Sequence, residues 1–388
     1  MSTTFTSAGT SSGLTNDELI RYSRHLLLPE VGVEGQKVLK SRSVLVVGAG
    51  GLGTPAATYL SAAGVGRIGL VDNDVIEKSN LQRQFLYTEA DLGRSKVDVA
   101  LARLKGINPN VTFEPHKVVL DSTNAMGILK NYDVIIDGTD NFPTRYLVND
   151  ACVLLGKPDV YASIFRFDGQ ASVFYAKDGP CYRCLFPQPP PPDTVPSCAE
   201  GGVLGVLPGI MGSIQAVQAI NLILNKGTTL VGRLLVFSAS DTTFTELRIS
   251  KNPDCPVCGP SPSVNHLIDY DQFCGVKRDE ASVDREISPV SLKARLDQGR
   301  RTVLVDVREP FEYSICHLQN ALLIPTGALP GRLGELNPAD EIVVYCHTGV
   351  RSARAVELLR AAGFAKARNL TGGIRAWAIE VDPSVPQY

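Results

Sequence analysis

The sequence has no excess of charge of either sign, since 38 Lys and Arg residues stand against 40 Asp and Glu residues among 388. Proteins that bind nucleic acids usually present a basic face, and this balanced composition gives no sign of one, so a nucleic-acid partner is not expected. A charged segment followed by an apolar stretch is missing near the N-terminus, so no export signal is indicated and a cytoplasmic location is expected. Residues 1–13, rich in Ser, Thr and Gly, are predicted to be disordered.

Long uncharged runs are rare, and one of them is long enough to cross a bilayer: residues 201–225. This run contains Pro208, Gln215 and Asn221, which are energetically unfavourable in an isolated membrane-spanning helix. We therefore expect a buried or dimer-interface helix over residues 213–224 and no membrane partner.

Nine cysteines are too few for a disulfide framework in a chain of this length, and four of them form two C-x-x-C pairs. Reduced thiols are expected. The length itself predicts two domains.

Apolar runs and turn signals predict an α/β fold in both domains. The runs at 44–47, 68–71 and 133–137 are typical of buried parallel strands, with helices over 54–63 and 96–104 between them. Strands over 171–175, 234–238 and 243–249 predict an antiparallel extension of the sheet. A capping box at Thr15–Glu18 starts a helix that continues through Arg24 and Leu28. A first domain over 14–260, a linker over 261–286 and a smaller α/β domain over 287–388 follow from this pattern.

A glycine loop follows the first predicted strand. Gly48-x-Gly50-x-x-Gly53 lies between a strand and a helix, and Asp72 ends the next strand. Glycines let the backbone approach a phosphate, and the helix N-terminus attracts it. The loop alone fits a dinucleotide-dependent dehydrogenase as well as an ATP site, and an empty strand–helix turn is a third possibility.

Charged residues farther along favour ATP. Arg83 and Lys96 could neutralise a triphosphate and a departing pyrophosphate, and Asp140, after a buried strand, could hold Mg²⁺. Hydride transfer needs none of these groups. The alternative is that these three side chains are ordinary solvated surface charges. Their clustering at strand ends argues against that interpretation.

These motifs resemble the MoeB/ThiF branch of the ubiquitin-activating superfamily over residues 14–260. The resemblance implies a Rossmann-like domain that uses ATP and Mg²⁺ to adenylate the C-terminal glycine of a ubiquitin-like sulfur carrier ending in Gly-Gly, in a homodimer. It implies that Asp72 holds the ribose, that Asp140 carries Mg²⁺ and that Arg24 reaches the partner subunit's ATP. The residues it assigns to nucleotide binding are Arg24, Gly51, Asp72, Ser79, Asn80, Leu81, Gln82, Arg83, Lys96, Asp140 and Asn141.

The two C-x-x-C pairs predict a closed zinc site. Four thiolates from Cys181, Cys184, Cys255 and Cys258 would surround Zn²⁺ tetrahedrally and leave no open position. The resemblance places such pairs here, whereas redox pairs would each follow a strand and start a helix. Cys198, after four successive prolines, aligns with the cysteine that relatives use for a covalent acyl bond; an incidental thiol is the alternative.

The second domain carries a short Cys-to-Arg loop, Cys346-His-Thr-Gly-Val-Arg351. It resembles a rhodanese domain, in which a strand-to-helix loop aims backbone N–H groups at the sulfur of Cys346, with Arg351 and the helix dipole stabilising its negative charge. A Cys-to-Arg loop can also serve a phosphatase, but phosphatases related to rhodanese have a loop one residue longer. A phosphatase is therefore the less favoured alternative. Two positions depart from the rhodanese pattern: His347 stands where Arg is common, and Cys316 replaces a Gly.

The whole chain thus resembles fused MoeB–rhodanese proteins. The resemblance implies a bifunctional adenylyltransferase and sulfurtransferase, in which a Cys346 persulfide attacks the acyl-adenylate and a second thiol, such as Cys198, releases the thiocarboxylate. The sulfur donor, thiosulfate or a cysteine desulfurase, is left open, and so is the pathway, whether molybdopterin, cysteine or a related product. The alternative is a thioester-forming activator that uses Cys198, with a rhodanese-like domain that only binds partners.

Overall fold

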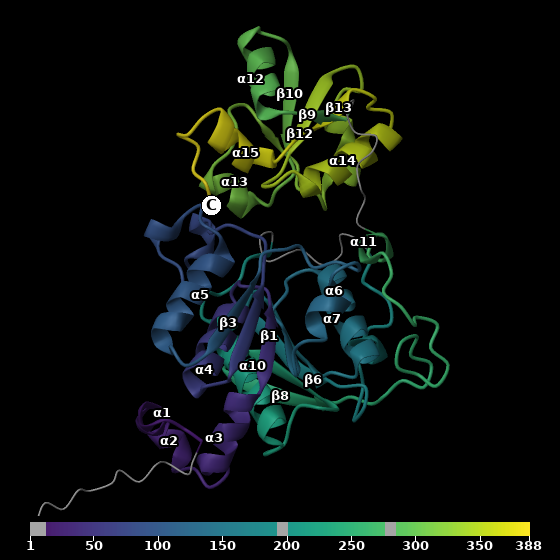
Figure 1. The fold of residues 1–388 in the computed structure, drawn as a ribbon. Helices are drawn as coiled ribbons and strands as arrows, with labels where there is room; N and C mark the ends of the chain where they lie inside the picture. The colour runs from purple at the N-terminus through teal and green to yellow at the C-terminus, as the bar shows by residue number, and fades with distance from the viewer. Residues whose placement is uncertain (1–12, 192–200, 276–284) are drawn as a thin grey trace, which may run out of the picture. The chain divides into compact units, whose positions relative to one another are not determined.

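The structure is a computed structural model that describes residues 13–191, 201–275 and 285–388, and Cys198 lies outside them. Two compact units divide the chain, Met1–Lys277 and Arg278–Tyr388 (Figure 1). Each unit has its own sheet and its own hydrophobic cores.

The first unit is built on an eight-stranded sheet with the order β3-β2-β1-β4-β5-β6-β7-β8. Strands β1 to β5 are parallel, and β6 to β8 extend the sheet in antiparallel pairs. The mostly parallel sheet with an antiparallel extension is therefore confirmed. The strands are β1 (Ser43–Val47), β2 (Arg67–Val71), β3 (Thr112–His116), β4 (Val134–Asp137), β5 (Asp159–Phe165), β6 (Asp168–Phe174), β7 (Arg233–Ser238) and β8 (Thr243–Arg248).

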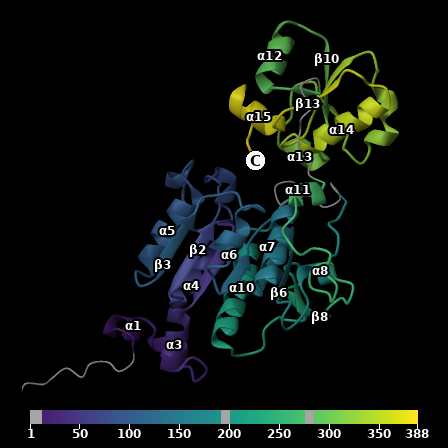
Figure 2. The ribbon, with the colours of Figure 1, turned by 45° about the vertical axis from the view of Figure 1, so that its right-hand side comes forward.

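Helices cover both faces of this sheet. Side chains along β1 point alternately to the two faces, and every residue of β1 is buried, so neither face is open to solvent there. Val44 and Val46 pack in one core with α4, α5 and α10, while Leu45 and Val47 pack in another with α6 and α7, which lie side by side (Figures 1 and 2). The helices are α1 (Asn16–Arg21), α2 (Ser23–Leu26), α3 (Gly32–Ser41), α4 (Gly53–Ala63), α5 (Lys96–Ile107), α6 (Ala125–Leu129), α7 (Phe142–Leu155), α8 (Tyr182–Leu185), α10 (Leu207–Leu224) and α11 (Tyr270–Phe273).

The apolar helix α10 begins at Leu207, earlier than the sequence predicts, because Pro208 fits the first turn of a helix. Among the described residues it is the one helix long and apolar enough to cross a membrane by length and composition. Its side chains nevertheless pack on the sheet, where the Gln215 amide donates to the carbonyls of Asp137 (2.6 Å) and Val160 (2.8 Å).

The predicted N-terminal helix is divided in two at Tyr22. The capping box at Thr15 and Glu18 is present, but Tyr22 leaves helical geometry, with φ −95° and ψ 12°. Its buried ring carries a hydroxyl that accepts a hydrogen bond from the Asn108 amide at 2.8 Å, so tertiary packing interrupts the helix. Arg24 lies on the second piece, α2, and is exposed.

The second unit is a five-stranded parallel sheet with the order β11-β10-β12-β13-β9. The smaller α/β domain is therefore confirmed. Its elements are β9 (Glu286–Ile287), α12 (Pro289–Asp297), β10 (Thr302–Asp306), α13 (Pro310–Ile315), β11 (Leu322–Leu323), β12 (Glu341–Tyr345), α14 (Val350–Ala361), β13 (Ala367–Leu370) and α15 (Gly373–Glu380).

Candidate functional site

Three parallel strands of the first unit end at one edge of the sheet. Val47 pairs with Val71 on one side and with Asp137 on the other. Past these pairs the Gly48 N–H donates to the Val71 carbonyl at 2.8 Å, and the Gly138 N–H donates to the Val47 carbonyl at 2.9 Å. The glycine loop, Asp72 and Asp140 therefore meet at this edge, as the sequence predicts for a nucleotide site.

The glycine loop is packed too closely for side chains at two positions. Gly48 has φ +95°, and a Cβ there would lie 2.8 Å from the carbonyl oxygen of Gly138. A Cβ on Gly53, the first residue of α4, would overlap the carbonyl oxygen of Gly48. Because the loop lacks side chains at these positions, its backbone N–H groups and the N-terminus of α4 can approach an anion closely.

Asp72 is fixed by the backbone. One carboxylate oxygen accepts the Ala49 N–H and the other accepts the Asp74 N–H, both at 2.8 Å. These bonds join the glycine loop to the segment after β2 and hold the carboxylate at the edge of the sheet.

Lys96 is buried at the start of α5 and forms an ion pair. Its ammonium lies 2.8 Å from a carboxylate oxygen of Asp74, to which sequence reasoning assigned no role. The Tyr87 hydroxyl donates to the Ala49 carbonyl at 2.7 Å and also lies 3.3 Å from the Lys96 carbonyl oxygen. Burial raises the pKa of Tyr87, so this hydroxyl stays protonated as a donor between the glycine loop and α5.

The segment around Arg83 lies against the glycine loop. The Arg83 guanidinium donates to the Ser79 carbonyl at 2.9 Å, and its Cδ is 3.7 Å from the position a Cβ would take on Gly51. Asn80 is buried and its side-chain oxygen accepts the Glu77 N–H at 3.2 Å. Leu81 packs against the core, and Gln82 is exposed, beside Gly205.

The turn that follows β4 exposes Asp140 and secures its neighbours. In the described residues no hydrogen bond or ion pair involves the Asp140 side chain, whereas the Asn141 side chain caps α7 by accepting the Thr144 N–H at 2.9 Å. Beneath the turn, buried Asp137 accepts the Thr139 N–H at 2.9 Å, and Arg145 donates to the Thr139 carbonyl at 3.0 Å. Asp140 is thus a carboxylate held on a rigid turn.

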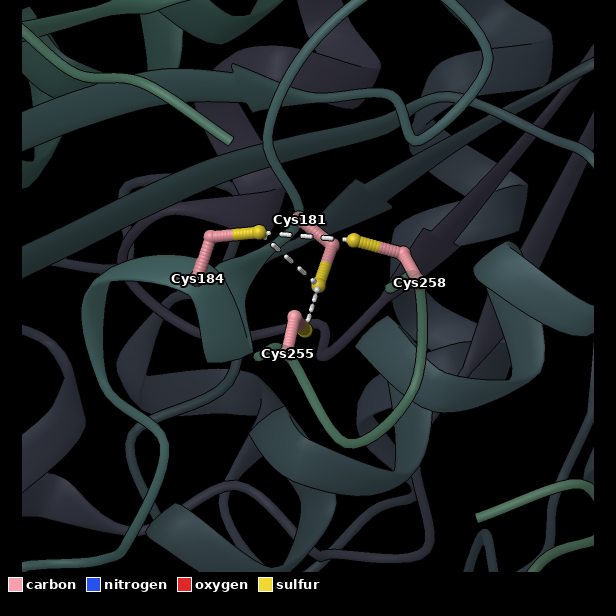
Figure 3. Close-up of side chains that lie close together, drawn as sticks. All are labelled: Cys181, Cys184, Cys255 and Cys258. Carbon is pink, nitrogen blue, oxygen red and sulfur yellow. Dashed lines mark hydrogen bonds between the residues drawn. The ribbon is translucent and has the colours of Figure 1, made fainter. Parts of the chain in front are cut away.

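The two C-x-x-C pairs converge on one point (Figure 3). The four sulfur atoms lie within 4.8 Å of one another, and the separations are 3.9 Å for Cys181–Cys184, 3.5 Å for Cys181–Cys255 and 3.3 Å for Cys184–Cys258. A tetrahedral zinc with bonds of about 2.3 Å would hold its sulfurs about 3.8 Å apart, so the cluster fits this ion with small adjustments. Hydrogen bonds within the cluster lower the pKa of Cys184 and Cys255 and raise the pKa of Cys181 and Cys258, so the four thiols share their protons, and a bound metal would displace these protons.

The residues between the first cysteine pair anchor it to α7. Tyr182 packs edge-on against Tyr146 with ring centroids 5.1 Å apart. Arg183, only 1% exposed, forms an ion pair with Asp150 at 2.7 Å. The cluster is thereby joined to the core of the first unit.

The Cys-to-Arg loop of the second unit surrounds a buried sulfur. Cys346 follows β12, and its Sγ accepts the Gly349 N–H at 3.1 Å and the Ser352 hydroxyl at 3.4 Å. Gly349 has φ +93° and directly precedes α14, so its N–H can turn back toward the sulfur. Negative charge on Cys346 would be met by these donors and by the N-terminus of α14.

Arg351, at the end of this loop, is paired with a carboxylate. Its guanidinium donates two hydrogen bonds of 2.7 Å to the Glu312 carboxylate on α13. Arg308 is paired in the same way with Asp306, at 2.9 Å from its Nε. The sequence alone offered no reason to assign Glu312 a role.

Two family models match the chain, the ThiF family over residues 22–257 and the rhodanese-like domain over residues 288–380. A protein of Mycobacterium tuberculosis named probable adenylyltransferase/sulfurtransferase MoeZ is 49% identical over 97% of both chains. Adenylyltransferase and sulfurtransferase MOCS3 of Culex quinquefasciatus is 44% identical over 97% of this chain and 90% of its own. Among solved structures, that of E. coli MccB with ATP shares the fold of the first unit, with a TM-score of 0.54 and 23% identity over 64% of this chain and 75% of its own.

Proposed function

The chain belongs to the ThiF family and carries a rhodanese-like domain, and relatives that match it over nearly their whole length are named adenylyltransferase and sulfurtransferase; we propose that it is a bifunctional adenylyltransferase and sulfurtransferase. It adenylates the C-terminal glycine of a ubiquitin-like sulfur carrier and converts it to a thiocarboxylate. The observation that carries this proposal is the presence of both sites in one chain: a glycine-loop edge with Lys96 and Asp140, and a donor-lined loop at Cys346.

The first reaction takes place at the glycine-loop edge. A carboxylate oxygen of the carrier attacks the α-phosphorus of ATP, the bond to the β-phosphate oxygen breaks, and pyrophosphate leaves with the electron pair. Arg83 and Lys96 neutralise the charge of the phosphates, and backbone N–H groups of the loop and α4 orient them. Asp72 lies where a ribose hydroxyl would be held, and the Ser79–Gln82 segment closes the side of the site next to Gly51.

Lys96 already has an anionic partner before any phosphate is bound. Its ammonium is paired with Asp74, and a phosphate would compete for it or share it. Burying an ammonium group without an anion beside it is energetically unfavourable. The ion pair with Asp74 therefore keeps Lys96 in place before ATP arrives.

Asp140 and Asn141 stand at the end of β4, where a phosphate-bound Mg²⁺ would be expected. Mg²⁺ would supply charge neutralisation for the phosphates, and the free carboxylate of Asp140 fits an oxygen ligand to it. Asn141 caps α7 through its side-chain oxygen and so holds the turn beside the nucleotide that we propose it helps to bind. Arg24, exposed on α2, would complete the ATP site of a second subunit in a homodimer.

The second reaction uses the Cys346 persulfide. Its outer sulfur attacks the carbonyl carbon of the acyl-adenylate, AMP leaves, and an acyl disulfide to Cys346 forms. A second thiol, for which we propose Cys198, attacks the Cys346 sulfur, so that the thiocarboxylate departs and a protein disulfide remains for a cellular thiol to reduce. A sulfur donor, thiosulfate or the persulfide of a cysteine desulfurase, then reloads reduced Cys346.

The proposal is tested by incubating the protein with ATP, Mg²⁺, thiosulfate and a purified ubiquitin-like carrier. Carrier-dependent ATP–pyrophosphate exchange and a carrier mass raised by the exchange of one oxygen for sulfur are expected. A carrier joined to Cys198 by a thioester, without thiocarboxylate, would support the activator alternative instead. Binding of a nicotinamide dinucleotide without exchange would support a dehydrogenase.

A further inference from the structure

The persulfide loop is covered on one side by residues 386–388, to which the proposed function gives no role. The ring of Tyr388 stacks on the ring of His347, with centroids 4.6 Å apart and planes 24° from parallel. The Cys316 thiol donates to the Pro386 carbonyl at 3.4 Å. His347 and Cys316 are the two positions that depart from the rhodanese pattern, and both contact this one segment.

The hydroxyl of Tyr388 reaches the charged groups of the site. It lies within hydrogen-bond distance of the Arg308 guanidinium and 3.4 Å from a carboxylate oxygen of Glu312, the partner of Arg351. Burial raises the pKa of Tyr388 to about 12, so the phenol is protonated at neutral pH and can donate to Glu312. Tyr388 therefore connects the Arg308–Asp306 pair to the Arg351–Glu312 pair.

His347 is a buried imidazole directly after Cys346, with 8% of its surface exposed. Among the described residues neither ring nitrogen makes a full hydrogen bond, although the Tyr388 backbone is close enough to act on the ring. Burial lowers the pKa of His347, Arg308 and Arg351 lower it further, and Glu312 and the backbone at Tyr388 oppose them. The ring is therefore neutral at neutral pH, and the Tyr388 ring shields one of its faces.

We infer that Tyr388 is a positioning residue for persulfide chemistry at Cys346. Its ring stacks on His347 and holds it in place, and its hydroxyl holds the Glu312 carboxylate to which Arg351 is bound. Both ends of the loop from Cys346 to Arg351 are thus fixed, and the Gly349 N–H stays directed at the sulfur. This inference rests on the proposed sulfurtransferase function.

The experiment compares Tyr388→Phe and Tyr388→Ala with Gln387→Ala in the full-length protein. Gln387 is the exposed neighbour and its side chain makes no hydrogen bond or ion pair among the described residues, so it serves as the matched control. Sulfur transfer from thiosulfate to cyanide is measured for kcat and KM across mildly acid to mildly alkaline pH. ATP–pyrophosphate exchange, which belongs to the other unit, reports on the integrity of the chain.

Tyr388→Phe loses one hydroxyl contact and should lower kcat about fivefold with KM little changed, as expected for one hydrogen bond. Tyr388→Ala also exposes His347, so kcat should fall about tenfold or more, and the acid limb of the pH profile should move to higher pH as the imidazole becomes easier to protonate. Gln387→Ala should match the wild type in both respects.

Alkylation of Cys346 by iodoacetamide, followed by peptide mass, gives a pH profile that does not depend on sulfur transfer. A wild-type protein that fails to transfer sulfur would overturn the proposed function, while alkylation would still test Tyr388. Wild-type kcat and unshifted profiles in Tyr388→Ala would overturn the inference. So would a defect seen only as lower thermal stability, with kinetics normal below the unfolding temperature.

Discussion

At the scale of single residues, two of the cations proposed to meet an anion are already bound to carboxylates. Lys96 is paired with Asp74, and Arg351 with Glu312. Sequence reasoning could identify the cations because they lie in recognisable motifs. It could not identify their partners, since the side chain that reaches a cation depends on how separate elements pack. The role of Tyr388 could not be predicted for the same reason, because its contacts with His347 and Arg308 exist only after folding.

Asp140 offers the clearest test of the adenylation site. Asp140→Ala should abolish carrier-dependent ATP–pyrophosphate exchange, because the oxygen ligand proposed for Mg²⁺ is lost. The side chain is exposed and makes no hydrogen bond or ion pair among the described residues, so the free energy of unfolding should change by less than about 0.5 kcal/mol. Asp178→Ala, an exposed acidic control away from the sheet edge, should keep full exchange. Near-normal exchange in a folded Asp140→Ala protein would remove Asp140 from the site.

At the scale of elements, strands with all-apolar runs were predicted best. β1, β2 and β4 lie within one residue of their expected positions, because a run buried on both faces leaves a strong signal. Shorter elements such as β9 and β11, of two residues each, leave too little pattern to be recognised. The division of the first helix at Tyr22 also escaped prediction, because a buried contact with Asn108 overrides the local capping signal.

The glycine loop should tolerate no side chain at Gly48. Gly48→Ala should destabilise the protein by about 1–3 kcal/mol, since alanine resists φ +95° and its Cβ would crowd the carbonyl of Gly138. ATP–pyrophosphate exchange should fall with it. Gly106→Ala, inside α5, meets no atom within 4 Å and should be neutral or stabilising by up to about 1 kcal/mol. Thermal unfolding of both variants measures the difference; equal stabilities would contradict the close packing of the loop.

The cysteine cluster should bind one zinc ion per chain. Cys255→Ser should lower both the zinc content and the unfolding temperature, the latter by about 5 °C or more, because metal-binding energy is part of folding energy. Cys274→Ser removes a half-buried thiol outside the cluster and should leave zinc content unchanged. Elemental analysis and thermal unfolding test both; full stability in a metal-free wild-type protein would contradict a structural zinc.

At the scale of the whole molecule, two units with separate cores carry two sites of different chemistry. The α/β class, the antiparallel extension and the adenylyltransferase–sulfurtransferase identity could all be predicted, because both motifs are local in sequence. The role of Cys198 stays a prediction, since it lies outside the residues that the structure describes. How one site passes its product to the other is likewise not encoded in any local pattern.

Cys346→Ala should separate the two activities of the chain. Adenylation uses the first unit, so carrier-dependent pyrophosphate release should persist at the wild-type rate. Sulfur transfer needs a thiolate held by backbone donors, and in the described part of the chain Cys346 is the cysteine whose sulfur accepts such a bond at the start of a long helix. Thiosulfate sulfurtransfer and thiocarboxylate formation should therefore fall to background, as measured by carrier mass. Free sulfide must be excluded, because it can attack the acyl-adenylate directly and bypass the cysteine. Thiocarboxylate made by the variant from thiosulfate would show that another residue carries the persulfide.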